Sequence, residues 1–109
     1  MAALVMAQFD VYPNPSDSAS HGMPYVVVLQ SDLLQALPTR VVLPLARQTA
    51  IGKVPLMLCP LVTVKGEALH ALAHFVAPLP ARLLKAPVGN LSAHASELVA
   101  AVDVVLSGV

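Results

Sequence analysis

The sequence predicts a mainly β domain, in which a short-stranded antiparallel sheet precedes one C-terminal α-helix. Ten prolines are spread along the 109 residues, and because proline interrupts helices, long helices are not expected before residue 90. Beyond that point apolar residues recur at helical spacing, and Asn90 or Ser92 can supply the capping oxygen. The apolar stripe consists of Leu91, Ala95, Leu98, Val102, Val105 and Leu106. At this length residues 1–109 are expected to form a single domain without internal repeats.

The expected strands are short runs of alternating or β-branched residues. The run at 25–29 is apolar without alternation, which indicates burial on both faces. Pro44 cannot donate to a strand ladder and is therefore expected at an edge or a bulge. The last two strands are expected to form a hairpin across Lys65 and Gly66. The strands are expected at residues 8–12, 25–29, 41–45, 56–64 and 67–75.

Two segments between these runs are expected to be loops. Residues 14–22 are rich in Ser, Asp and Pro and are expected to be flexible, and residues 47–53 contain Gly52, which permits a turn. Residues 1–6 are apolar but lack the basic region of a secretory signal. We expect them to be a disordered or alternative-start extension, with Met6 as the functional initiator.

The composition excludes several classes of protein. Hydrophobic residues make up 57% of the chain and charged residues 11%, against roughly 25% charged in an ordinary soluble domain, so a buried interface between two copies is expected. Residues 54–64 and 98–109 are far shorter than the ~20 apolar residues of a membrane-spanning helix. The net charge is zero and the basic residues are scattered, so direct nucleic-acid binding is not expected. The single Cys59 excludes an internal disulfide and fits a reducing, cytoplasmic location.

The residues that could carry chemistry do not form a catalytic pattern. His70 and His74 would share a metal on a helix, but on the expected strand they lie ~13 Å apart. Cys59 is expected to be a small buried hydrophobic residue rather than a nucleophile. The carboxylates are dispersed and there is no glycine-rich phosphate loop. We therefore expect no catalytic residues, no metal and no cofactor.

Two segments could contact a partner. Residues 30–34 are expected to form a polar turn that contains two leucines. This pattern is typical either of a strand edge with core leucines or of a contact loop. Residues 98–106 stay apolar almost to the end of the chain, so the terminus is expected to be docked or presented to another molecule.

Five segments then stand in an order and spacing that resembles CcdB toxins, the gyrase poisons of toxin–antitoxin modules. Leu58-Cys59-Pro60-Leu61-Val62 is similar to the family's Leu-Tyr-Pro-Val-Val strand. Leu91-Ser92 opens a C-terminal helix of matching length that closes at Gly108 and an aliphatic last residue. The resemblance covers roughly residues 7 to 109. Its other segments are residues 8–12, 30–34 and 42–46.

The resemblance implies a small SH3-like barrel with a C-terminal helix, assembled as a symmetric homodimer. In this family the paired helices enter the DNA gyrase A-subunit dimer and trap the cleaved-DNA state, so such a protein is not an enzyme. The resemblance gives gyrase contacts to Ser107, Gly108 and Val109, with Leu106, Asp103, Leu33 and Leu34 in support. It also implies a CcdA-like antitoxin, whose disordered segment folds over the C-terminal helix and residues 47–54. The antitoxin contacts would include Arg47, Lys53, Val54, Leu98 and Val102.

The chain departs from the family at its functional end. Gyrase-binding members end in Trp-Gly-Ile, whereas this chain has no tryptophan and carries Ser107 at the position of the indole. Asp103 stands where an Asn is usual, and Leu106 replaces a Phe. A second hypothesis is therefore a protein of this fold that has lost gyrase poisoning and serves as an antitoxin-binding or regulatory module. A third is a MazF-like endoribonuclease, which would need a basic RNA groove that this neutral chain lacks.

Overall fold

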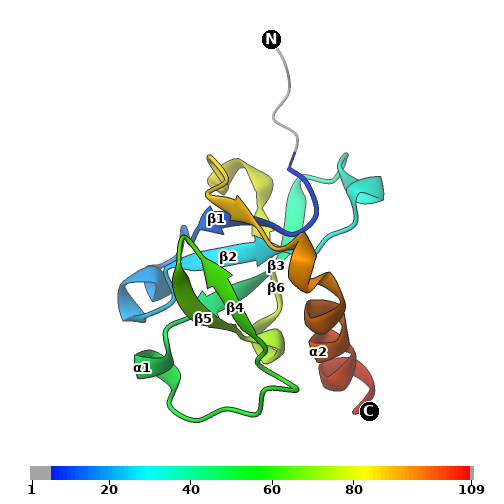
Figure 1. Cartoon of the computed structure of the whole chain (residues 1–109). Helices are drawn as coiled ribbons and strands as arrows, with labels where there is room; N and C mark the ends of the chain where they lie inside the picture. Colours follow the sequence, from blue (N-terminus) through cyan, green and yellow to red (C-terminus); the bar gives the residue numbers. More distant parts are fainter. Residues whose placement is uncertain (1–5, 109) are drawn as a thin grey trace.

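Within residues 6–108, seven strands form one strongly curved antiparallel sheet, and a C-terminal helix packs against one of its faces (Figure 1). The computed structural model describes residues 6–108. The strand order is β4-β5-β3-β2-β1-β7, and β6 pairs with β3 beside this path. The expected mainly β, SH3-like barrel with a C-terminal helix is therefore confirmed. The strands are β1 (Asp10–Pro13), β2 (Tyr25–Val28), β3 (Thr39–Ala46), β4 (Leu61–Val64), β5 (Glu67–Ala71), β6 (Ala77–Pro80) and β7 (Gly89–Asn90). The helices are α1 (Gln48–Ile51) and α2 (Ala95–Ser107), with 3₁₀ turns η1 (Asp17–His21), η2 (Asp32–Leu34), η3 (Ala73–Phe75), η4 (Ala81–Leu83) and η5 (Ser92–His94).

The longest strand, β3, lies in the middle of the sheet and changes partner along one side. Its other side pairs with β2, whereas this side pairs with β6 at residues 39–42 and with β5 at Leu45 and Ala46. Pro44 lies between the two partners, and its carbonyl accepts a hydrogen bond from the Leu72 N–H at 3.0 Å. The expectation of an edge strand or a bulge was wrong. The missing proline donor is tolerated because it falls where one partner ends and the next begins.

The predicted hairpin is present, with shorter strands than expected. Lys65 and Gly66 adopt φ values of 51° and 78° and connect β4 to β5. Residues 56–60, expected to belong to the first strand, form a turn instead, in which the Cys59 N–H donates to the Pro55 carbonyl at 2.8 Å. Prolines at 55 and 60 flank this turn, so an uninterrupted ladder cannot form there.

Both expected loops contain an ordered helical turn. In the first, η1 is fixed by the Asn14 side chain, which donates to the Ser18 hydroxyl at 2.8 Å and to the Met23 carbonyl at 2.9 Å. The second contains α1, which lies against Gly22. The segment 14–22 is thus a loop with one 3₁₀ turn, in which local side-chain hydrogen bonds replace a strand ladder.

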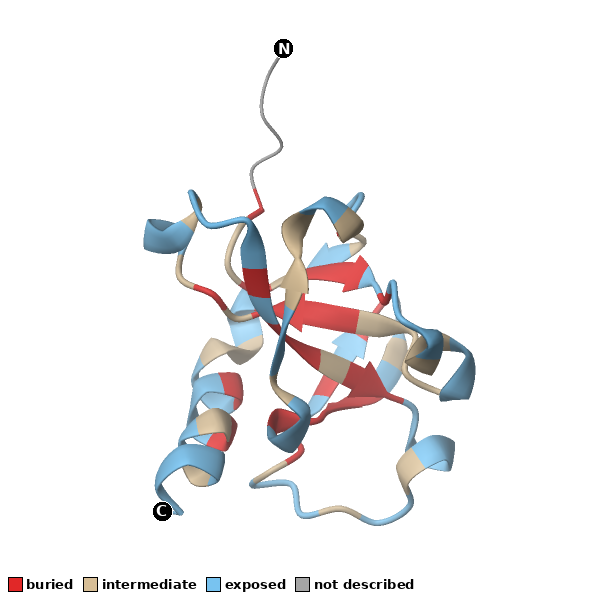
Figure 2. Ribbon diagram, turned by 180° about the vertical axis from the view of Figure 1, so that it is seen from behind, coloured by how far each residue is buried: buried red, intermediate tan, exposed pale blue. Residues whose placement is uncertain are grey.

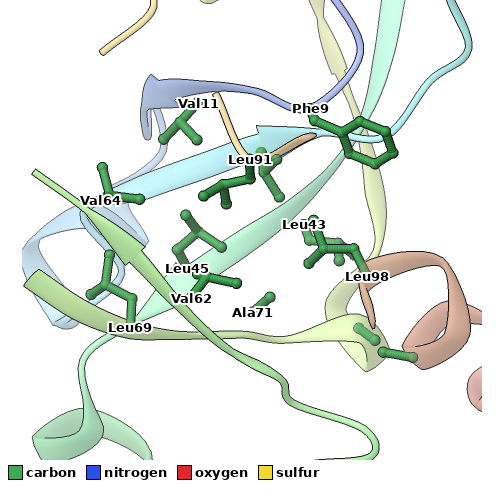
Figure 3. Packing of buried hydrophobic residues seen from close by; sticks show 13 residues of the cluster. Phe9, Val11, Leu43, Leu45, Val62, Val64, Leu69, Ala71, Leu91 and Leu98 are labelled. Carbon is green, nitrogen blue, oxygen red and sulfur yellow. The ribbon is translucent and has the colours of Figure 1, made fainter. Parts of the chain in front are cut away.

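The core fills the space between the curved sheet and the inner side of α2. Figure 2 shows the buried residues along the strands and on one side of the helix. In Figure 3, Leu91 and Leu98 point toward Leu43 and Val62. The other sheet face carries a smaller cluster around Tyr12. The central valines of β2 divide between the two clusters, which confirms the predicted burial on both faces.

Only part of the predicted apolar stripe of α2 is buried. Leu98 is fully buried and Ala95 and Val102 are half-buried, whereas Val105 is exposed and Leu106 in the last turn is 75% exposed. Ala101, which was not in the predicted stripe, is also fully buried. The Asn90 side chain accepts a hydrogen bond from the Ser92 N–H at 2.8 Å, just before the 3₁₀ turn η5 that leads into α2. The N-cap residue of α2 is His94, so the expectation that Asn90 or Ser92 caps this helix was wrong. None of the helices within residues 6–108 is long and apolar enough to cross a membrane.

Candidate functional site

The last turn of α2 presents apolar surface in a fixed conformation. Gly108 closes the helix in the left-handed conformation, with a φ of 71°, and donates its N–H to the Val104 carbonyl at 2.9 Å. The Ser107 hydroxyl donates back to the Asp103 carbonyl at 2.7 Å, so it is engaged within the helix. Leu106 is left as the most exposed apolar side chain of the described helix. Val109, the last predicted contact, lies outside the described residues.

An apolar groove of about 440 Å³, which we call the helix groove, lies between α2 and the segment that joins β2 to β3. Val99 and Val102 contribute from the helix, and Leu34 and Val41 contribute from the opposite side. Asp103 is the one charged residue among those that line it. The groove therefore brings together Leu34, Val102 and Asp103, which the family resemblance had assigned to partner contacts. Its remaining lining residues are Leu29, Gln30, Leu37, Thr39 and Val76.

Polar hydrogen bonds hold the 30–37 segment so that its leucines face outward. The Ser31 hydroxyl accepts from the Leu33 N–H at 3.2 Å, and Asp32 accepts from the Gln8 N–H at 2.8 Å. The buried guanidinium of Arg40 donates to three carbonyls of this region, at residues 35, 37 and 39. Leu33 is 94% exposed and Leu34 is also exposed. The interpretation of this turn as a strand edge with core leucines was therefore wrong, and the contact loop stays a prediction.

A second hollow of about 360 Å³, the loop hollow, lies on another side of α2. Leu56 and Met57 line it from the 55–60 turn, and Ala100 and Val104 line it from the helix. Leu56 and Met57 are both largely exposed. This surface was not predicted from the sequence, because both residues were expected in a strand. The two prolines that flank the segment were the signal for a turn.

The five predicted antitoxin contacts do not form one surface. Val102 lines the helix groove, whereas Leu98 is fully buried and packs inward, away from solvent. Arg47 forms an ion pair with Glu67 at 2.7 Å, with both side chains substantially exposed. Lys53 is exposed and Val54 packs against a small cluster beside α1. Figure 1 shows α1 and α2 at opposite sides of the molecule, so one partner segment would have to extend between them.

Cys59 and His70 are buried in the fold, whereas His74 lies at its surface. His70 is buried in β5, where its Nδ1 lies 2.9 Å from the Cys59 carbonyl and its Nε2 lies 2.6 Å from the Gln48 side-chain oxygen. His74 is exposed and lies in η3 instead of on the expected strand. Burial raises the pKa of the Cys59 thiol, which makes its thiolate harder to form. Within residues 6–108, no three His, Cys, Asp or Glu side chains are grouped closely enough to hold a metal ion.

The comparison with known families agrees with this architecture. The family model described as CcdB protein matches residues 8–108, a span that includes all seven strands, the helix groove and the whole of α2. No curated protein matches the chain at a significant level. Since the matched span covers almost the entire chain, the protein belongs to the CcdB family.

Proposed function

We propose that this chain is the toxin of a type II toxin–antitoxin module, and that it binds the DNA gyrase A subunit through α2 and inhibits the topoisomerase. Membership of the CcdB family supports the toxin assignment. The observation that carries the proposed contact is the exposed Leu106 on the capped last turn of α2, with the helix groove on the flank of the same helix. An apolar helix end that is already folded loses little conformational freedom when it binds a partner.

The proposed active form is a homodimer in the cytoplasm. Large apolar side chains are exposed on α2, on the η2 turn and on the 55–60 turn, and only 11% of the residues are charged. A second copy would remove part of this surface from water. Pairing of two α2 ends would also place two copies of Leu106 side by side.

The proposed antitoxin is a CcdA-like protein that covers α2 and competes with gyrase. Residues 91–109 contain Glu97 and Asp103 but neither Lys nor Arg, so the helix surface is acidic. A complementary antitoxin segment would combine an apolar face for the helix groove with basic residues for these carboxylates.

The alternative function is an antitoxin-binding or regulatory module that no longer poisons gyrase. It is favoured by Ser107, whose hydroxyl is engaged with the Asp103 carbonyl and cannot replace an indole. A central aromatic anchor contributes about 2 kcal/mol or more, which corresponds to roughly thirtyfold in affinity.

The experiment that separates these functions is a supercoiling and DNA-cleavage assay with gyrase from the source organism. The toxin assignment predicts trapped cleavage complexes, their loss on removal of residues 107–109, and their relief by the cognate antitoxin. Ser107→Trp should strengthen trapping by at least about tenfold, because it adds a buried aromatic anchor. Ser20→Ala, an exposed serine in η1, is the matched control and should leave trapping unchanged. If the wild-type chain has no effect on gyrase while the antitoxin still binds it, the alternative function holds instead.

A further inference from the structure

A third pocket, of about 310 Å³, lies on the sheet face opposite α2, between the 14–23 segment and β6. Val26 and Val42 line it, and both belong to the cluster around Tyr12. Their neighbours along the strands, Val27 and Leu43, point to the other face and into the core beneath the helix. The pocket is therefore separate from the helix groove and from the contacts proposed for gyrase and the antitoxin.

The interior of this pocket is apolar and has an aromatic wall. Pro44 and Leu79 extend the apolar lining beyond the two valines. The ring of Phe75 also lines the pocket and is 48% exposed, so one side of it is available for contact. None of the lining residues is charged. Such a surface suits a neutral, planar apolar ring, because a charged ligand would lose its hydration without gaining a counter-charge.

The polar rim of the pocket is a closed ring of hydrogen bonds. Asn14 Nδ2 donates to Ser18 Oγ at 2.8 Å and also to the Met23 carbonyl at 2.9 Å. Ser16 Oγ donates to Asn14 Oδ1 at 3.0 Å, since an amide oxygen can only accept. The two serine oxygens lie 2.7 Å apart, so Ser18 supplies the proton of that contact because Ser16 has already used its own.

This ring determines which ligand group the rim can bind. Every donor hydrogen of the three side chains is used within the ring or on Met23, but each serine oxygen keeps a free lone pair. Two lining backbones add no donor, since Pro44 has no N–H and the Phe75 N–H donates to the Leu72 carbonyl at 3.0 Å. The side chains of the rim can accept a hydrogen bond but have no donor hydrogen left, so they favour a ligand that carries the donor.

We propose that this pocket binds a small neutral aromatic molecule with a single N–H donor, of the indole class. The bicyclic ring would cover Val26 and Val42 and lie against Phe75, while its N–H donates to Ser16 or Ser18. The chain has no tryptophan, so a second copy of the protein cannot supply such a ring.

The test is a titration of the ¹⁵N-labelled full-length protein with indole, followed by amide chemical shifts. Indole should shift amides of residues 14–23 and 75–79 and leave those of α2 in place. 1-Methylindole has the same ring without the donor and should bind about fivefold more weakly, the value of one hydrogen bond. Equal affinity of the two compounds, shifts confined to α2, or no shift at the solubility limit of indole would overturn the proposal.

Substitutions in the pocket provide a second test, in which the protein is changed instead of the ligand. Ala77→Leu, at an exposed position of β6 that lines the pocket, should fill it and abolish indole binding. Replacing Ser16 and Ser18 together by Ala should weaken indole about fivefold and leave 1-methylindole unchanged, whereas Ser20→Ala, outside the pocket, should change neither. Thermal unfolding checks that each variant is folded. Unchanged indole binding in a folded Ala77→Leu variant would contradict the assignment, as would tighter binding of N-acetyltryptophanamide, which would indicate a receptor for a protein side chain.

Discussion

Gly22 shows how one residue connects two parts of the fold. It has a φ of 87°, its carbonyl accepts a hydrogen bond from the Arg47 N–H at 2.8 Å, and an added Cβ would overlap the Ala50 side chain of α1. Its role is therefore set by both the left-handed conformation and the close approach of α1, and only the first of these is a local property.

Gly22→Ala should lower the free energy of unfolding by about 2 kcal/mol, because the variant must strain its backbone and displace α1. Urea unfolding followed by circular dichroism measures the change. Gly89→Ala is the matched control, since nothing lies within 4 Å of a Cβ built there and its effect should be within about 0.5 kcal/mol. Equal losses in the two variants would show that neither the left-handed backbone nor the approach of α1 constrains position 22.

Asp103 places a negative charge near the C-terminal end of α2, where the helix dipole disfavours it. Asp103→Asn should therefore raise the free energy of unfolding by about 0.3 kcal/mol at low salt. Glu97→Gln, in the first turn of the same helix, should have the opposite sign. Thermal unfolding at low and high salt tests both, and the prediction is contradicted if the two variants shift stability in the same direction.

At the scale of elements, β6 is an edge strand protected by proline. The Val41 carbonyl accepts from the Leu29 N–H and its own N–H donates to Gln30, so the backbone of Val41 faces β2. Pro78 lies opposite Val41 in the pairing with β3, and its nitrogen therefore points away from β3. Pro80 is two residues further on and has the same orientation. The outer side of β6, which has no strand partner within residues 6–108, thus lacks free N–H donors at both positions.

Replacing Pro78 and Pro80 together by Thr should restore two donors to this edge and promote self-association of the folded protein. Light scattering at equal protein concentration measures the effect. Pro87→Thr, in an exposed connection outside the strands, is the control and should not scatter more than the wild type. An unchanged double variant would mean that the edge is covered by some other part of the chain.

The elements that the sequence predicted well are those with local signals. The β-branched run of β2, the turn at Lys65 and Gly66, and the helical stripe of α2 each depend on residues close together along the chain. The 55–60 turn was missed because its apolar composition resembles a strand, although the flanking prolines prevent a ladder.

The candidate site was predictable only in part. The helix groove joins Leu34 to Val102, residues far apart in the sequence, so only the fold reveals it. Leu98 shows the same limit, because apolar spacing identifies a helix face but not which part of that face is covered by the sheet.

At the scale of the whole molecule, the proposed binding of gyrase by two paired α2 helices requires a dimer. The exposed apolar side chains and the low charged fraction predict a sedimentation mass of two chains at micromolar concentration. Analytical ultracentrifugation measures this mass directly. A purely monomeric protein at high concentration would remove the paired-helix arrangement from the proposed mechanism.

The central claim is that the exposed end of α2 is the surface that contacts gyrase. Its most direct test is calorimetric titration of the source organism's gyrase A subunit with the wild-type protein, Leu106→Asp and Leu61→Asp. Both leucines are exposed, on α2 and on β4 respectively, so the two variants add the same charge at different sites. We predict that Leu106→Asp weakens binding by at least about tenfold and that Leu61→Asp binds like the wild type. Equal affinities for wild type and Leu106→Asp, with both variants folded, would contradict the claim.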